Sequence, residues 1–252
     1  MNDKKNMAAS VRQRLLNRAR ADKRPFAELL QYYAIERFLF RLSQSEHARK
    51  FILKGALLLR TWGAAIARPT MDIDLSGRTS NDISAIRGQI TDVIDIDLND
   101  GLIFDSKSIR VERITEAADY NGIRVRFLGY LGTARINMQI DIGFGDAVFP
   151  EPTVVKLSSV IGPDHFTMLG YSRESAIAEK VDTMVTLGLV NSRMKDFHHI
   201  WLLSRMSVTT APSDFGSIMA QVQAFVEPVL QCILSSNPFD LTWKAPGPWR
   251  NS

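Results

Sequence analysis

Three segments in the middle of the chain alternate apolar and polar residues, and this pattern most constrains the fold. They span residues 108–114, 123–130 and 134–144. Turn signals at Asn121-Gly122 and at Gly132 separate them. Alternation with a period of two is typical of half-buried strands, and glycine-containing connections are typical of hairpins. The sequence therefore predicts an antiparallel or mixed sheet.

Shorter patterns surround this sheet. Further strands are expected over residues 51–54 and 71–75, and helices over residues 10–19, 26–42, 56–62 and 80–98. Beyond about residue 150 helical patterns dominate, with helices expected over 174–187, 192–204 and 213–234 and a packed, irregular tail over 237–252. The expected fold is α+β. A mixed sheet with flanking helices would occupy residues 1–150, and a mainly helical part residues 151–252.

Charge is distributed unevenly along the chain. Residues 1–24 hold eight bases and two acids, a net charge of +6, which leaves −2 for the rest of a chain whose formal net charge is +4. A basic arm on a slightly acidic body suits a protein that handles a polyanion. A solvated basic helix would have the same composition.

The single cysteine, Cys232, excludes an internal disulfide and fits a reducing compartment. The basic N-terminus is not followed by an apolar stretch long enough for a signal peptide. The apolar stretches elsewhere fall short of a membrane span. We therefore expect a cytoplasmic protein that does not use a membrane.

The segment Asp72-Ile73-Asp74-Leu75 alternates acid with aliphatic residue. In a strand, this places both carboxylates on one face and both aliphatic side chains on the other. Two close carboxylates repel each other unless water or a cation lies between them. Mg²⁺ favours one or two carboxylates together with phosphate oxygens, so the pair suits nucleotide chemistry. The same pair also occurs on solvated strand edges.

Asp141 adds a third carboxylate. In residues 136–142 the apolar side chains fall on one parity, so Asp141 shares the polar face with Asn137 and Gln139. If this strand neighbours that of Asp72 and Asp74, three carboxylates converge. Two would hold a metal ion, and the third would share it or accept a proton from an attacking hydroxyl.

Lys54-Gly55-Ala56 closes an expected strand and opens an expected helix. Backbone N–H groups at a helix start attract phosphate oxygens, and glycine lets a ligand approach the chain closely. Lys54 would add a positive charge, or would extend into solvent from the strand end. This segment and the two carboxylates together favour a nucleotide site.

Several segments resemble, in order, the abortive-infection AbiEii/AbiGii family of nucleotidyltransferase toxins. They are residues 51–59, 68–75, 141–145, 178–180 and 193–197, so the resemblance covers most of the chain between residues 51 and 203. It implies a nucleotidyltransferase-fold head with a helical C-terminal part. Members of this family act as toxins that a partner antitoxin counters, and some transfer nucleotides to the 3′ end of tRNA.

The resemblance also implies roles for individual residues. Asp72 and Asp74 would bind Mg²⁺ or Mn²⁺, and Asp141 would occupy the third-carboxylate position. Lys180 would hold the NTP triphosphate, and Asp196 would complete the catalytic set. The other positions expected at the nucleotide are Lys54, Gly55, Ala56, Arg68 and Arg193.

The chain departs from the family pattern at two positions. Ala56 stands where the family often has a second glycine, and His199 stands where a second acid often follows the Lys-Asp pair. His198 and His199 are neighbours, and adjacent helical residues do not share a face, so we assign no zinc site. We therefore expect a Mg²⁺-dependent nucleotidyltransferase that moves a nucleoside monophosphate from an NTP to RNA, with the 3′ end of tRNA as the expected acceptor, as the toxin of a toxin–antitoxin pair. The alternatives are a protein or small-molecule acceptor, and a relative that binds NTP without turnover.

Overall fold

The computed structural model describes residues 2–63, 70–114, 122–187, 194–205, 214–236, 238–244 and 247–251. The chain forms two compact units, Met1–Ser172 and Arg173–Ser252. We call them the head unit and the helical unit and describe each by itself. The division lies beyond the expected boundary near residue 150, because the chain forms two more strands of the head sheet before the helices begin.

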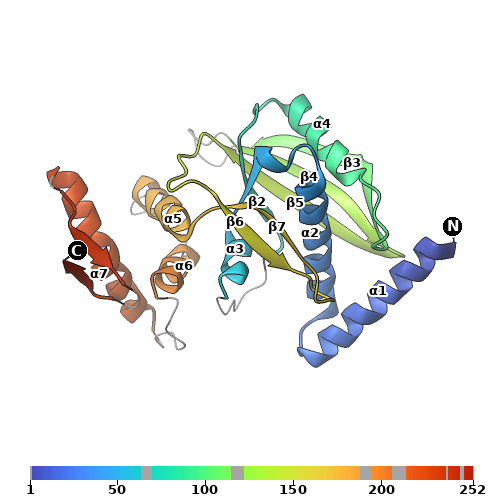
Figure 1. Cartoon of the computed structure of the whole chain (residues 1–252), viewed down its shortest axis with the longest axis horizontal. Helices are drawn as coiled ribbons and strands as arrows, with labels where there is room; N and C mark the ends of the chain where they lie inside the picture. The colour runs from blue at the N-terminus through green and yellow to red at the C-terminus, as the bar shows by residue number, and fades with distance from the viewer. Residues whose placement is uncertain are drawn as a thin grey trace. The chain divides into compact units, whose positions relative to one another are not determined.

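The head unit contains both helices and strands (Figure 1). Its helices are α1 (Asn2–Ala21), α2 (Phe26–Gln44), η1 (Ala48–Lys50), α3 (Ala56–Thr61) and α4 (Ile83–Ile94). Its strands are β1 (Phe51–Lys54), β2 (Ile73–Gly77), β3 (Leu102–Ile114), β4 (Gly122–Leu131), β5 (Ala134–Phe144), β6 (Thr153–Ser158) and β7 (His165–Gly170).

These strands form one seven-stranded sheet in the order β3-β4-β5-β2-β1-β7-β6. The neighbours β2 and β5 run parallel, as do β1 and β7, and the other pairs are antiparallel. The mixed sheet predicted from the alternating segments is therefore confirmed. Contrary to expectation, helical patterns do not dominate directly after residue 150, because the chain there forms β6 and β7. The prolines taken as signs of irregular chain lie at 150, 152 and 163, outside these two strands.

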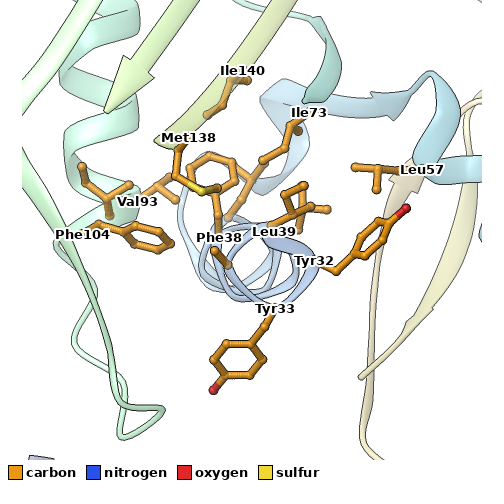
Figure 2. Close-up of a cluster of buried hydrophobic side chains, with 14 of the residues drawn as sticks. Tyr32, Tyr33, Phe38, Leu39, Leu57, Ile73, Val93, Phe104, Met138 and Ile140 are labelled. Atoms are coloured by element: carbon orange, nitrogen blue, oxygen red, sulfur yellow. The ribbon is translucent and has the colours of Figure 1, made fainter. Parts of the chain in front are cut away.

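Helix α2 packs across the apolar face of this sheet. Figure 2 shows Phe38 and Leu39 pointing from α2 toward Ile73 of β2 and Ile140 of β5. All four side chains are fully buried. Phe38 also meets Phe127 with ring centroids 5.8 Å apart. Burial of side chains of this size stabilises a fold by roughly 1.5–3 kcal/mol each, so this layer fixes the sheet that carries the polar residues on its other face.

A buried ion pair joins α2 to the segment before β3. Arg41 is 2% exposed, and its guanidinium lies 2.8 Å from Asp100, which also accepts a hydrogen bond from Arg37 at 2.8 Å. Arg41 donates further hydrogen bonds to the carbonyl oxygens of Ile96 and Leu102. A fold tolerates a buried charge when the charged group is ion-paired and its hydrogen bonds are satisfied. Arg41 therefore ties the helix to the sheet through polar contacts.

Helix α1 docks on the head unit through one apolar stripe. Ala8, Val11, Leu15 and Ala19 are buried, and Gly101 packs directly against the backbone of Ala8. The helix begins at Asn2, so the prediction of a start capped by Ser10 is wrong. Residues 2–9 contain no glycine or proline that would stop the helix, and Ala8 already contributes to the buried stripe.

The helical unit contains α5 (Arg173–Leu187), α6 (Met194–Ser204) and α7 (Phe215–Ser235), close to the expected helices. Residues 192 and 193 lie outside the described residues. The tail is not irregular, because β8 (Leu241–Trp243) and β9 (Trp249–Asn251) form a hairpin. Trp243 and Trp249 both pack on Phe225 of α7, with ring centroids 4.7 and 5.6 Å away. Packing of these aromatic rings thus stabilises a hairpin whose sequence does not alternate regularly between apolar and polar residues.

One helix in the described part of the chain, α7, is long and apolar enough to cross a membrane by length and composition. It also carries Glu227 and Pro228, and Gln221 accepts a hydrogen bond from Trp201 of α6 at 2.8 Å. Ile218 and Val222 of α7 share a small core with Ile200 and Trp201 of α6. Within this unit α7 therefore acts as a packing helix.

We predict that Arg41→Met lowers the free energy of unfolding by about 3 kcal/mol, because it removes one of the two cations that compensate buried Asp100. Arg78→Met is the matched control, since the Arg78–Glu151 pair is largely exposed, and we expect it to change stability by less than about 1 kcal/mol. Urea unfolding of both variants measures the difference. Equal losses would show that the Arg41 pair has no special structural role.

Candidate active site on the head unit

Four charged side chains lie in one row across the middle of the sheet. Asp74 of β2 is the register partner of Asp141 of β5, Lys54 of β1 is the partner of Asp74, and Arg124 of β4 is the partner of Asp141. Register partners on adjacent strands point to the same face of a sheet. Two carboxylates therefore lie side by side between two cations, on the face opposite Ile73 and Ile140.

Asp72 lies just before β2, on the same parity as Asp74, and is exposed. Its position is fixed by buried Gln31 of α2, whose amide donates hydrogen bonds to the carbonyl oxygens of Met71 at 3.2 Å and Asn137 at 3.0 Å. Gln31 thus couples the residue before Asp72 to β5. All three predicted carboxylates lie in one unit, at the meeting point of β2 and β5.

Gly55 lies directly against the carboxylate of Asp74. A Cβ atom at Gly55 would lie 2.1 Å from Asp74 Oδ2, and the residue has φ of +73°. Both features require glycine, because L side chains rarely adopt this backbone and no real side chain could occupy that space. The backbone that enters α3 at Ala56 is therefore in contact with one of the predicted metal ligands.

Arg124 forms a bidentate ion pair with Asp141. Its Nε and Nη2 atoms each lie 2.8 Å from a different oxygen of that carboxylate. Such two-point contacts are strong and fix the carboxylate plane. Arg124 compensates the charge of Asp141 beside Asp74, so the sheet tolerates two adjacent acids. Sequence reasoning missed Arg124, because its role depends on the pairing of β4 with β5.

Lys54 is 5% exposed, and its ammonium lies 2.9 Å from the carboxylate of Asp146. The hydroxyl of Tyr171 donates to the same carboxylate at 3.2 Å, and the backbone N–H of Tyr171 donates to the carbonyl of Leu53. Lys54 therefore does not extend into solvent. Asp146 and Tyr171 were also missed from the sequence, because both lie in connections outside the alternating segments.

These residues fit a divalent cation with a bound triphosphate. Asp72 and Asp74 offer carboxylate oxygens from alternate positions of one strand, and Mg²⁺ prefers such ligands in combination with phosphate oxygens. Gly55 leaves the backbone accessible beside Asp74. Asp72 and Asp74 could therefore hold the metal ion, while Asp141 lies next to it with its charge compensated by Arg124.

The helical unit brings together the other two predicted catalytic residues. Lys180 of α5 donates a hydrogen bond to Asp196 of α6 at 3.2 Å, and the Asp196 side chain is 2% exposed. Asp196 lies in the first turn of α6, where the helix dipole favours a negative charge. Arg68 and Arg193 lie outside the described residues. Their predicted contacts with the nucleotide stay predictions, as do the roles of Lys180 and Asp196.

His199, which departs from the family pattern, lies one turn after Asp196. Burial, followed by the charge of Lys180, lowers the pKa of His199 to about 4. Its Nδ1 atom is buried and has no hydrogen-bond partner among the described residues. The ring is therefore neutral at physiological pH and adds no charge to the Lys180–Asp196 pair.

A second group of possible metal ligands lies elsewhere in the head unit. One ligand atom each from Glu46, His47 and Asp92 lies within 4.8 Å of the others. However, both nitrogens of His47 are already engaged, by Asp92 at 2.9 Å and by the ammonium of Lys50 at 3.0 Å. A lysine ammonium next to the ring opposes a cation there, so we do not assign this group as a metal site.

Comparison with known proteins gives a family match over most of the chain. The family model described as nucleotidyl transferase AbiEii toxin, type IV toxin–antitoxin system, matches residues 37–247. None of the curated proteins matches.

Solved structures give more distant similarities. The crystal structure of JHP933 from Helicobacter pylori is 15% identical, with a TM-score of 0.49, over 82% of this chain and 79% of that one. The solution structure of the antibiotic-resistance factor ANT(2'')-Ia is 14% identical, with a TM-score of 0.37, over 80% of this chain and 94% of that one.

We predict that Gly55→Ala weakens NTP binding in the presence of Mg²⁺ at least tenfold, because the new methyl group displaces the Asp74 carboxylate. Gly63→Ala is the control: Gly63 also has positive φ, but a Cβ there meets none of the described atoms within 4 Å. Gly55 combines positive φ with ψ of −157°, a region essentially confined to glycine, so its substitution also carries a backbone cost of about 1–3 kcal/mol. Only Gly55→Ala should lose affinity. Equilibrium dialysis with labelled NTPs measures this, and wild-type affinity in Gly55→Ala would contradict the site.

We also predict that His199 makes the stability of the fold sensitive to acid. Its folded pKa of about 4 lies below the ordinary value of 6.5, so the unfolded chain binds the proton more readily between these values. Stability is therefore lost as pH falls through 6.5 toward 4, by about 2 kcal/mol between pH 7 and pH 5. Urea unfolding of wild type and His199→Gln at both pH values tests this. The variant should lack that part of the pH dependence; an identical dependence would refute it.

Proposed function

Because the chain belongs to the AbiEii nucleotidyl transferase toxin family, we propose that it moves a nucleoside monophosphate from an NTP to the 3′ end of an RNA. The acceptor that we propose is tRNA, and the reaction depends on Mg²⁺ or Mn²⁺. One observation supports the metal-dependent part most strongly. Asp74 and Asp141 are register partners on adjacent parallel strands, and Gly55 lies against the first of them.

The reaction forms one bond and breaks another. The oxygen of the acceptor hydroxyl bonds to the α-phosphorus, the bond between the α- and β-phosphates breaks, and pyrophosphate leaves. The hydroxyl proton passes to a base, for which Asp141 is the candidate if it does not share the metal ion. Most of the rate enhancement in such a transfer comes from positioning and from compensating negative charge.

The residues of the head unit match these requirements. Asp72 and Asp74 would hold the divalent cation, which would neutralise charge on the triphosphate. The backbone at Gly55 and Ala56 would offer its N–H groups to the phosphates. Lys54 keeps the end of β1 in place through its ion pair with Asp146, and so positions the glycine. Arg124 orients Asp141.

The proposal extends to the cellular setting. The family description places these enzymes in type IV toxin–antitoxin systems, so we propose that a cognate antitoxin counters this chain. The net charge of +6 over residues 1–24 favours RNA over a protein or small-molecule acceptor. A tRNA acceptor requires a cytoplasmic location.

We predict that purified protein with Mg²⁺ and NTPs labelled at the α-phosphate transfers label to total tRNA, and that Asp74→Asn lowers the rate at least a hundredfold, because it removes a metal ligand. Asp164→Asn, which changes an exposed acid in the turn between β6 and β7, is the control and should keep wild-type activity.

Fractionation of a labelled lysate identifies the acceptor class. Label in protein or in small molecules, but not in RNA, would show that the acceptor is not RNA. The proposed nucleotidyl transfer itself would still stand. Full activity of Asp74→Asn would reject the chemistry.

A further inference from the structure

Several arginines on the head unit lie over aromatic rings of α2. The guanidinium of Arg12 lies 5.5 Å from the ring centroid of Phe26, at the start of α2. Arg24 and Arg60 lie over the same Tyr32 ring, at 5.3 and 4.2 Å. These contacts connect α1, the turn after it and α3 to α2 (Figure 1).

A guanidinium that lies over a ring can still donate hydrogen bonds to a second partner, and guanidinium groups suit phosphate. Arg12 and Arg60 are exposed, whereas Arg24 also pairs with Glu28. Tyr32 itself is buried, and its hydroxyl accepts a hydrogen bond from the N–H of Thr70. The ring beneath Arg24 and Arg60 is therefore held in place.

The series ends on α3, where Arg60 lies over Tyr32. Arg60 lies in α3, whose first residue follows Gly55, and Gly55 touches Asp74. Arg60 also lines a cavity of about 160 Å³ between α2, α3 and β6, together with exposed Lys156. Arg12, Arg24, Arg60 and Lys156 therefore form a row of positive charge that we call the basic track. It leads from α1 to the helix next to the site.

Two of the four track residues, Arg12 and Arg24, precede the part of the chain that matches the family. The match begins at residue 37, so α1, Arg24 and Tyr32 all lie before it. Positive charge is concentrated in the same part, with a net charge of +6 over residues 1–24. Arg12, Arg24 and Tyr32 therefore lie outside the matched range.

We propose that the basic track binds the phosphate backbone of the RNA acceptor and directs its 3′ end toward Asp74. The RNA partner is taken from the proposed function. Phosphate contacts by arginine and lysine supply most sequence-independent affinity for nucleic acids, and each contact adds to the salt dependence of binding. The track therefore contributes to affinity and to acceptor position, while Asp72, Asp74 and Asp141 carry the chemistry.

The test compares two triple variants of the full chain with the same loss of charge. The track variant replaces Arg12, Arg60 and Lys156 by Gln, and leaves the Arg24–Glu28 pair intact. The control replaces Arg49, Arg113 and Lys107, which are exposed elsewhere on the head unit, by Gln. Fluorescence anisotropy measures binding of a short RNA hairpin with a single-stranded 3′ overhang across a range of salt concentrations. Urea unfolding shows that each variant folds.

The track variant should bind the hairpin at least tenfold more weakly at about 0.1 M salt, with a salt dependence reduced by about 2–3 counterions, while the control stays within about twofold of wild type. Equal losses in both variants, no loss in either, or no binding of the hairpin by wild type would overturn the proposal. The two failures are distinguishable. If the hairpin binds through the track but no label is transferred to RNA, only the proposed function is rejected. If the track variant binds the hairpin and transfers label as wild type does, only the role of the basic track is rejected.

Discussion

The parallel pairing of β2 with β5 places Asp74 next to Asp141, and the rest of the head unit is organised around that pair. The two strands are far apart in the sequence, and only their shared register brings the acids together. The apolar partners in the same two strands, Ile73 with Ile140 and Leu75 with Ile142, are fully buried on the opposite face. A shift of register by one residue would expose these side chains and bury the acids, so the core holds the acids in place.

Like charges directly opposite each other on adjacent strands destabilise a sheet, and the chain compensates for this in two ways. Arg124 binds Asp141 through two hydrogen bonds on one side of the pair. On the other side, Lys54 is the register partner of Asp74 and is itself held by Asp146. Charge compensation by fixed side chains keeps the acids adjacent before any metal binds. A divalent cation would then add to a site that is already assembled.

Much of this site could be predicted from the sequence, because its main elements have local signals. Alternation predicted the strands of Asp74 and Asp141 and the face of each acid, and Lys54-Gly55 marked the end of β1. Arg124, Asp146 and Tyr171 could not be predicted, because their roles depend on which strands become neighbours and on where connections run. Likewise, β6 and β7 were missed because the prolines around them suggested irregular chain, although these prolines lie outside the strands. The hairpin of Trp243 and Trp249 depends on packing against Phe225, which a local pattern does not encode.

We propose that Asp72 and Asp74 hold a divalent cation next to Asp141. Anomalous scattering from crystals grown with Mn²⁺ and a non-hydrolysable NTP analogue tests it directly, because it locates the ion without reference to activity. We expect a manganese peak at about 2.0–2.3 Å from carboxylate oxygens of Asp72 and Asp74, with the analogue's phosphates beside Gly55. A peak only at Glu46, His47 and Asp92, or nucleotide bound with no ion at Asp74, would contradict it.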